Sequence, residues 1–366
     1  MRAKKKLEPD FVIILAVMLL IAIGIIMVFS SSSYTSKDIL GDSFYFLKKQ
    51  FVWAVLGTFF MVVTMKIDYF RLKRITNPIF IFCVIMLFLV LVMGDSSKGA
   101  TRWLGIGSLS FQPSETIKLG MILFLSKFLS RKQSQITSFT YGVTPVLIII
   151  GVICALIIAQ PDLGTVLVVA GTGYLLLAAA GARISHLVGL GLVGIALVGV
   201  AIALAPYRMA RFTAFLDPWA DPIGDGFQTI QSLYALGSGG LFGVGIGESR
   251  QKMYFLPEKH TDFIFAIIGE ELGFIGATVI LLLFIVFIWR GFKVAVTAPD
   301  SFGSLLAMGI TSMIALQAII NIGVVTGSLP VTGITLPFIS YGGSSLIFTM
   351  TAVGILLNIS RYSSSK

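Results

Sequence analysis

Long apolar stretches, separated by shorter polar segments, recur along the whole chain. Ten of them approach the length of a helix that crosses a bilayer, which is about 20 residues. We expect these helices at residues 11–30, 50–67, 76–94, 114–130, 141–159, 163–181, 185–205, 263–290, 302–325 and 343–360. Because a spanning helix satisfies its own backbone hydrogen bonds, the pattern predicts an all-α polytopic membrane protein. Residues 1–366 are expected to form a single membrane domain.

The polar segments indicate which way the bundle faces. Basic residues gather at both termini and in every second connection, and short basic segments mark the cytoplasmic side. An even number of helices puts both termini on one side, so we expect both in the cytoplasm. The basic residues concerned are Arg2, Lys4, Lys5, Lys6, Lys66, Arg71, Lys73, Arg74, Lys127, Arg131, Lys132, Arg183, Arg290, Lys293, Arg361 and Lys366.

The basic N-terminal segment and the apolar stretch after it resemble a signal peptide. However, the apolar stretch is long, and the SSSSY that follows it offers no clear A-x-A cleavage site. We therefore interpret residues 11–30 as an uncleaved first helix.

The connections on the outer side are rich in Gly, Pro and Ser. They are residues 94–115, 159–165, 206–262 and 327–345. The third, between the seventh and eighth helices, is over fifty residues long, and loops of that length are usually functional or structured. Within it, GFQTIQSLYALGSGGLFG (226–243) predicts a short helix at the membrane interface that ends at glycines.

The composition supports a membrane protein. Apolar residues make up 56% of the chain and charged residues only 12%, against about 25% charged in a soluble domain. The net charge of +10 is explained mainly by basic cytoplasmic loops, so no nucleic-acid partner is expected. Cys83 and Cys154 lie in apolar stretches and are interpreted as buried thiols.

Two glycine motifs resemble nucleotide-binding loops. GLGLVG (189–194) matches G-x-G-x-x-G, but it lies inside an apolar helix with no preceding strand, so helix packing explains it better. GSGGLFGVGIGES (237–249) lacks the G-K-[ST] ending of a P-loop. It is interpreted either as a flexible turn at the interface or as a place where the backbone approaches a substrate closely.

FQPSETIKLGM (111–121) opens the fourth helix. Pro113 and Ser114 are typical of a helix start. Glu115 and Lys118 are three residues apart and therefore share one face. They are either a structural ion pair or the polar wall of a substrate cavity. Asp162, at the outer start of the sixth helix, is interpreted as an N-terminal cap.

A further group of cations lies in the outer connections of the predicted bundle. They are Lys98, Arg102, Arg208, Arg211, Arg250, Lys252 and Lys259. Long loops escape the positive-inside rule, so topology does not forbid them. They form either a solvated cluster or a site that captures an anion such as a pyrophosphate, for which arginine is well suited.

LPEKHTDFIFAIIGEELGF (256–274) places Asp262, Glu270 and Glu271 around the outer end of the eighth helix. Asp262 stands at its mouth, and Glu270 lies about 12 Å further in, at 1.5 Å per residue. Glu270 and Glu271 must face protein or water, and one of them is expected to pair with a basic residue. A partly desolvated Asp262 can have a raised pKa and act as a general base.

Several of these strings together resemble the SEDS family (shape, elongation, division and sporulation). They are FQPSE..K, QPDLGT, PYR, DPW.DP.G.GFQ..QSL.A.G.GG..G.G.G.SRQK, LPE.HTDFIFAI..EELGF and GITLPF.SYGGSS, which together run from about residue 102 to 361. They are most similar to the cell-division and sporulation branch, of the stage V sporulation protein E type.

The resemblance implies a ten-helix peptidoglycan glycosyltransferase that polymerises lipid II at the outer face of the bacterial cytoplasmic membrane. It implies Asp262 as the catalytic aspartate and Glu115 with Lys118 as the family's fourth-helix pair. It also implies a class B penicillin-binding protein as partner, within the division or sporulation wall-synthesis machinery. We expect substrate contacts from Glu115, Lys118, Arg102, Gln112, Arg208, Arg211, Lys252 and His260.

In the expected reaction, Asp262 deprotonates the GlcNAc 4-hydroxyl of the acceptor, which displaces undecaprenyl pyrophosphate from the donor. Arg208, Arg211, Lys252 or a divalent cation would stabilise the leaving charge. No His/Cys cluster predicts a tightly bound metal, so any Mg²⁺ or Mn²⁺ would arrive with the substrate. The alternatives are a lipid II flippase, whose charges should line the full depth of the bundle, and a non-catalytic scaffold for a penicillin-binding protein.

Overall fold

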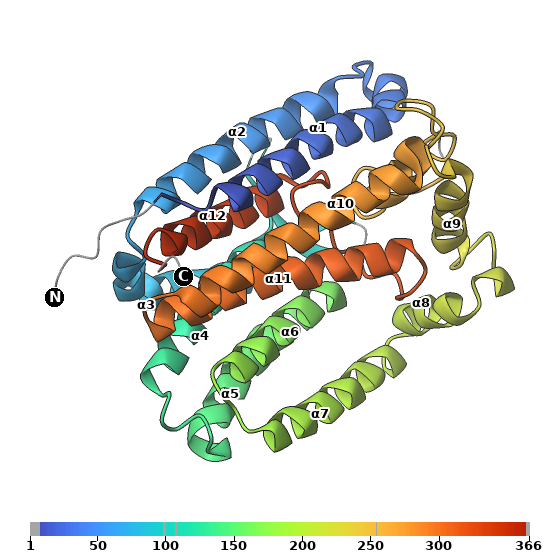
Figure 1. Ribbon diagram of the computed structural model, residues 1–366. Helices are drawn as coiled ribbons and strands as arrows, with labels where there is room; N and C mark the ends of the chain where they lie inside the picture. Colours follow the sequence, from blue (N-terminus) through green and yellow to red (C-terminus); the bar gives the residue numbers. More distant parts are fainter. Residues whose placement is uncertain (1–7, 98–99, 107–108, 254, 364–366) are drawn as a thin grey trace.

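The chain is a bundle of membrane-length helices whose two termini lie at one end (Figure 1). The computed structural model describes residues 8–97, 100–106, 109–253 and 255–363. The basic residues predicted at the extreme termini, Arg2, Lys4, Lys5, Lys6 and Lys366, lie outside the described residues, as does Lys98. The segment between α7 and α10 lies at the end opposite the termini.

Helices account for nearly all of the regular structure. In the described part of the chain they are α1 (Phe11–Leu40), α2 (Tyr45–Lys66), α3 (Tyr69–Met93), α4 (Pro113–Arg131), η1 (Phe139–Val143), α5 (Thr144–Ile158), α6 (Leu163–Ala179), α7 (Ile184–Ala203), α8 (Pro206–Leu216), η2 (Pro218–Ala220), α9 (Phe227–Gly239), α10 (Ile264–Thr297), α11 (Ser301–Val325) and α12 (Gly343–Ser360).

Each of the ten predicted spans is a helix: α1 to α7 and α10 to α12. Eight of them are long and apolar enough to cross a membrane, judged over the described residues. The two others are α4, which carries Glu115, Lys118, Lys127 and Arg131, and α6, which is short. Both pack against α11 inside the bundle, where protein rather than lipid surrounds them.

The first helix is longer than its apolar stretch predicts. It continues through the serine run, where the Ser32 hydroxyl donates to the Val28 carbonyl at 2.6 Å and the neighbouring serines also bond back to the helix. It ends at Gly41, whose φ of 73° is the left-handed conformation that glycine adopts easily. The outer end of α1 therefore extends well past residue 30.

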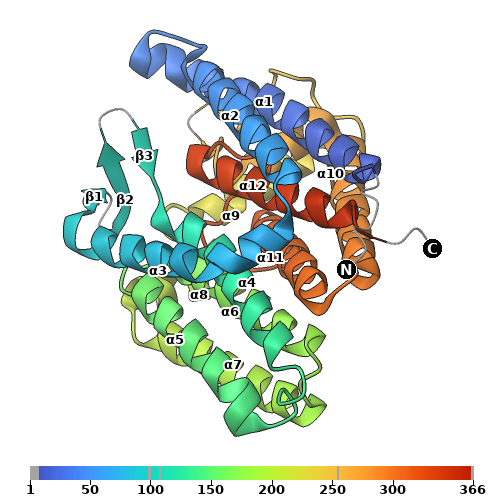
Figure 2. The ribbon, with the colours of Figure 1, turned by 90° about the vertical axis from the view of Figure 1, so that its left-hand side faces the viewer.

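The outer segments contain structure that the sequence analysis did not predict. Residues 94–115 include a small antiparallel sheet of three strands in the order β1 (Asp95–Ser97), β2 (Ala100–Ile106), β3 (Leu109–Phe111). In Figure 2 the strands lie beside α3. The long loop contains the predicted short helix as α9, preceded by α8, which was not predicted.

The glycine-rich loop after α9 fills a break in α10. Gly273 has φ 67° and ψ −168°, so α10 consists of a short outer half and a long inner half. The loop bonds to both sides of the break: Val244 N donates to Glu270 O at 3.0 Å, and Phe274 N donates to Gly240 O at 2.9 Å. A Cβ at Gly243 would lie 2.1 Å from the Glu271 carbonyl oxygen. The glycines thus permit close approach of the loop backbone to α10.

Candidate active site

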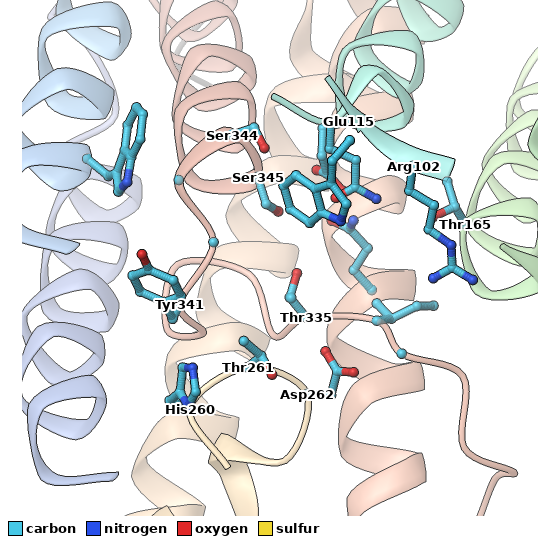
Figure 3. Close-up of a pocket in the computed structure, with 18 of the residues that line it drawn as sticks. Arg102, Glu115, Thr165, His260, Thr261, Asp262, Thr335, Tyr341, Ser344 and Ser345 are labelled. Carbon is cyan, nitrogen blue, oxygen red and sulfur yellow. The ribbon is translucent and has the colours of Figure 1, made fainter. Parts of the chain in front are cut away.

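A cavity of about 720 Å³ opens at the end of the bundle that faces away from the termini, and Figure 3 shows side chains that line it. Its walls come from α2, β2, the first turns of α4 and α6, and two loops, 258–262 and 333–345. Five of the predicted substrate contacts and the predicted base line it: Glu115, Lys118, Arg102, Gln112, His260 and Asp262. Segments far apart in the sequence therefore meet here.

Asp262 lies immediately before α10 on a loop that is fixed from behind. The Asn321 side chain on α11 donates to the backbone oxygens of Asp262 and Ile334, each at 2.7 Å. The Ser340 hydroxyl donates to the Thr261 carbonyl at 2.6 Å, and Tyr341 N donates to the His260 carbonyl at 2.9 Å. These bonds tie the loop to residues 334–341 and direct the Asp262 carboxylate into the cavity, as Figure 3 shows.

The surroundings of Asp262 disfavour its charged form. Desolvation raises its pKa to about 7, and the negative charges of Glu258 and Asp162 act in the same direction. Arg211 and Arg102 oppose the shift. Among the described residues, no hydrogen-bond donor or ion-pair partner lies at its carboxylate oxygens. Asp262 is thus a carboxylate that can take up and release a proton near neutral pH.

Glu115 and Lys118 form a buried ion pair in the cavity wall. Pro113 starts α4, and the Lys118 Nζ to Glu115 Oε1 distance is 2.8 Å. Both side chains are almost fully enclosed, yet both line the cavity. The pair is therefore both a buried ion pair and a part of the cavity wall.

The remaining predicted contacts in the cavity are held by neighbouring backbone and rings. Arg102 on β2 donates to the Gln160 carbonyl at 3.0 Å and to the Pro161 carbonyl, which fastens the sheet to the start of α6. His260 packs against the Phe46 ring at 4.7 Å. Asp162 caps α6 as predicted, by accepting from Thr165 N at 3.1 Å, and it also lines the cavity.

Three predicted contacts do not line the cavity. Arg208 on α8 donates to the Ala201 carbonyl at 3.0 Å, and Arg211 to the Val331 carbonyl at 3.4 Å. Arg211 nevertheless acts on Asp262 through its charge. The prediction that Lys252 contacts substrate is corrected, because its ammonium group is enclosed in a buried ion pair with Glu271.

Several residues that line the cavity were not predicted. They are Lys48, Lys49 and Trp53 of α2, Gln317 of α11, and Thr335, Ser344 and Ser345. Two sequence signals could have found them. One is the pair of basic residues Lys48 and Lys49 at the start of an apolar stretch, and the other is the polar string SYGGSS in the last outer connection. Neither signal indicates, from the sequence alone, that α2 and the 333–345 loop line the same cavity.

The described residues contain no group of three or more His, Cys, Asp or Glu side chains placed to hold a metal ion. The two cysteines are free thiols, with Cys83 buried and Cys154 half-buried. A cation in this cavity would therefore need ligands from the substrate as well as one or two carboxylates.

Comparison with known proteins gives matches over nearly the whole chain. Residues 10–365 match the FtsW, RodA and SpoVE family model, described as cell cycle protein. The chain is 53% identical to stage V sporulation protein E of Bacillus subtilis (strain 168), over 98% of this chain and 99% of the relative. It is 44% identical to the probable peptidoglycan glycosyltransferase FtsW of Geobacter metallireducens, over 96% and 94%.

Two solved structures resemble the fold. One chain belongs to the structure described as "Structural coordination of polymerization and crosslinking by a peptidoglycan synthase complex"; it has a TM-score of 0.81, 32% identity, and coverage of 97% of this chain and 99% of that one. The rod shape determining protein RodA of Thermus thermophilus has a TM-score of 0.74 and 28% identity, with 98% of each chain covered.

Proposed function

This chain belongs to the FtsW, RodA and SpoVE family of cell cycle proteins, and from that premise we propose that it is a peptidoglycan glycosyltransferase. In this proposal it polymerises lipid II into glycan strands at the outer face of a bacterial cytoplasmic membrane. The observation that carries the proposal is the position of Asp262. Its carboxylate points into a cavity at the end of a multi-pass membrane bundle, and its pKa is raised to about 7.

The cavity has the chemistry that lipid II requires. This substrate combines an isoprenoid tail, an anionic pyrophosphate and a sugar–peptide head. Lys48, Lys49, Arg102 and Lys118 line the cavity and supply positive charge for the pyrophosphate. Val52, Trp53 and Leu56 on α2 supply apolar surface beside them, on a helix that exposes further apolar side chains such as Phe51, Val55 and Phe59.

We assign Asp262 the role of general base. It accepts the proton of the GlcNAc 4-hydroxyl of the acceptor, and that oxygen forms a bond to the anomeric carbon of the donor. The bond from this carbon to the pyrophosphate oxygen breaks, and undecaprenyl pyrophosphate leaves. A pyrophosphate leaving group needs counter-charge rather than a proton, so one carboxylate suffices. Arg211 and Arg102 are the arginines whose charge offsets the negative charge around Asp262.

We propose that no metal is tightly bound and that any divalent cation is carried in by the pyrophosphate. Asp262 and Asp162 are carboxylates of the cavity that could share such a cation. Bound there, it would neutralise charge on the leaving group.

We propose that both termini are cytoplasmic and that the cavity faces outward. This orientation follows from the basic residues of the connections at the terminal end, such as Arg71, Arg131 and Arg183. We also propose a class B penicillin-binding protein as partner, within a division or sporulation complex. The similarity to a chain of a peptidoglycan synthase complex supports this partner.

The flippase alternative needs charge along the full depth of the bundle. Glu270 and Glu271 are the residues that suggested such a path, but neither lines the cavity, and Glu271 is paired with Lys252. A non-catalytic scaffold would not require a carboxylate with a raised pKa in the cavity, whereas a general base does.

The test is polymerisation of labelled lipid II by the chain in nanodiscs, with and without a class B penicillin-binding protein that has no glycosyltransferase of its own. Glycan strands should form, and Asp262→Asn should reduce their rate by at least about 100-fold, because a general base typically contributes that much. Asp225→Asn, at an exposed carboxylate of the same long loop, is the matched control.

A fully active Asp262→Asn variant would remove the base assignment. If no strands form under either condition, while lipid II crosses liposome bilayers that contain the chain, the flippase alternative replaces the enzyme.

A further inference from the structure

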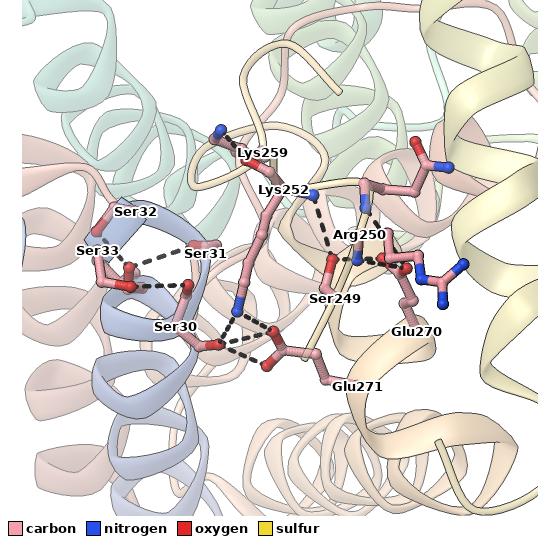
Figure 4. A network of polar contacts seen from close by, with 12 residues as sticks. Ser30, Ser31, Ser32, Ser33, Ser249, Arg250, Lys252, Lys259, Glu270 and Glu271 are labelled. Atoms are coloured by element: carbon pink, nitrogen blue, oxygen red, sulfur yellow. Dashed lines mark hydrogen bonds and ion pairs between the residues drawn. The ribbon is translucent and has the colours of Figure 1, made fainter. Parts of the chain in front are cut away.

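A buried polar network joins α1, α10 and the loop that leads to Asp262 (Figure 4). The Lys252 Nζ to Glu271 Oε1 distance is 2.8 Å, and the Ser30 hydroxyl lies 2.7 and 2.6 Å from the two Glu271 oxygens. Lys252 Nζ also lies 3.3 Å from the Ser30 hydroxyl. The Lys252 and Glu271 side chains are only 4% and 0% exposed, so this contact is sealed from water and from the cavity.

Glu270 fixes the same loop one residue earlier on α10. Its carboxylate accepts hydrogen bonds from the Ser249 hydroxyl and from the backbone N–H of Arg250 at 2.9 Å. The backbone N–H of Lys252 donates to the Ser249 hydroxyl at 3.2 Å. The two adjacent glutamates therefore hold residues 249–252 against the outer half of α10, immediately outward of the Gly273 break.

A path of hydrogen bonds continues from Lys252 toward Asp262. The Lys259 ammonium donates to the Lys252 carbonyl, and Lys259 is itself buried. The carbonyl of the preceding residue, Glu258, accepts hydrogen bonds from the backbone N–H groups of Thr261 at 3.1 Å and Phe263 at 3.2 Å. Asp262 thus lies inside a turn whose preceding segment is anchored at Lys252.

A buried ion pair of this kind is poorly explained by stability alone. The cost of taking both charges out of water offsets much of their attraction, and well-packed apolar residues of similar size are often as stable. What the pair adds is one defined arrangement of three separate segments. Here those segments are the outer half of α1, the outer half of α10, and the loop ahead of Asp262.

We propose that Ser30, Lys252 and Glu271 are positioning residues for the glycosyl transfer. They hold the 249–262 loop in the one register that directs the Asp262 carboxylate into the cavity. This inference rests on the proposed function, because it concerns the base of that reaction. None of the three residues lines the cavity, so their effect must pass through the loop.

The deciding variant is Lys252→Met with Glu271→Met, which removes both charges together and keeps unbranched side chains of similar length. We expect turnover of lipid II to fall about tenfold or more, because a small displacement of a catalytic group is costly, while KM stays within about twofold. The acidic limb of the pH–rate profile should move to lower pH, since a loosened loop admits water to Asp262. Glu258, Asp162, Arg211 and Arg102, the charges around Asp262, are unchanged in this variant.

The matched control is Asp10→Asn with Arg290→Met. This pair also joins α1 to α10, with an Arg290 Nη2 to Asp10 Oδ2 distance of 2.6 Å, but at the opposite end of both helices. It should leave turnover and pH profile as in the wild type. Ser30→Ala is a milder second variant that adds no charge, and it should lower turnover about threefold in the same direction.

A measurement that does not depend on enzymatic activity distinguishes the positioning proposal from the proposed glycosyltransferase function. Hydrogen–deuterium exchange of residues 255–263 should speed up in the double variant and not in the control. If exchange is faster in the double variant but the wild type forms no glycan strands, the result contradicts the proposed function, while the three residues still hold the loop in place. Unchanged exchange, turnover within about twofold of wild type, or an equal loss in the control would overturn the positioning role.

Discussion

Two groups of carboxylates near the outer end of α10 differ in how their charge is compensated. Glu271 is enclosed by Lys252 and Ser30, and each of its oxygens accepts a hydrogen bond. Asp262, just before the same helix, opens onto a cavity, and desolvation together with its acidic neighbours Glu258 and Asp162 raises its pKa. A carboxylate whose hydrogen bonds are satisfied holds segments together, whereas one that is only partly compensated can exchange a proton with a substrate.

The largest expected effect is on the stability of the fold, and it distinguishes the paired carboxylate of Glu271 from the carboxylate of Asp262. Lys252→Met alone would leave the Glu271 carboxylate buried without its cation, at a cost of about 3–5 kcal/mol. We expect a clear fall in the Tm of the chain in nanodiscs, largely restored when Glu271→Met is added. Asp262→Asn should show no fall at pH 8, because its desolvated charge opposes folding above its usual pKa. An equal fall for both variants would show that the two groups do not differ.

The next effect tests whether Glu115 and Lys118 belong with the cavity or with the structural pairs. Glu115→Gln removes the partner of Lys118 and should lower turnover of lipid II about tenfold, equivalent to about 1.4 kcal/mol in the barrier. Adding Lys118→Met should not restore turnover, since both side chains line the cavity. Recovery of activity in the double variant would make the pair structural, like Lys252 with Glu271.

The smallest effect is a shift along the pH axis. Asp262 must be ionised to accept a proton, so its pKa of about 7 predicts that the rate rises between about pH 6 and pH 8. Glu258→Gln removes a charge that raises this pKa and should move the limb to lower pH. Arg211→Gln removes a charge that lowers it and should move the limb to higher pH. If the acidic limb of the pH–rate profile moved in the same direction in both variants, the limb would not report the ionisation of Asp262.

The site was partly predictable because its residues are unusual in their sequence context. Charged residues beside or within apolar stretches, such as Asp262, Glu115 and Lys118, must face protein or water, so the pattern alone marks them. Arg102, Gln112 and His260 lie near these positions in the chain and also reach the cavity. Lys252 was misassigned because an outward cation in a loop has the same sequence signal whether it meets a substrate or a buried glutamate.

Apolar stretches of bilayer length required helices, so ten helices and their order followed from the sequence. The alternation of basic and glycine-rich connections separated the two ends. Tertiary structure decided the rest, because it depends on partners that are distant in the chain. Ser30 meets Glu271, Asn321 holds the backbone of Asp262, and the loop around Gly243 fills the break at Gly273. A local pattern marks where a charge is costly, but only packing selects the group that compensates it.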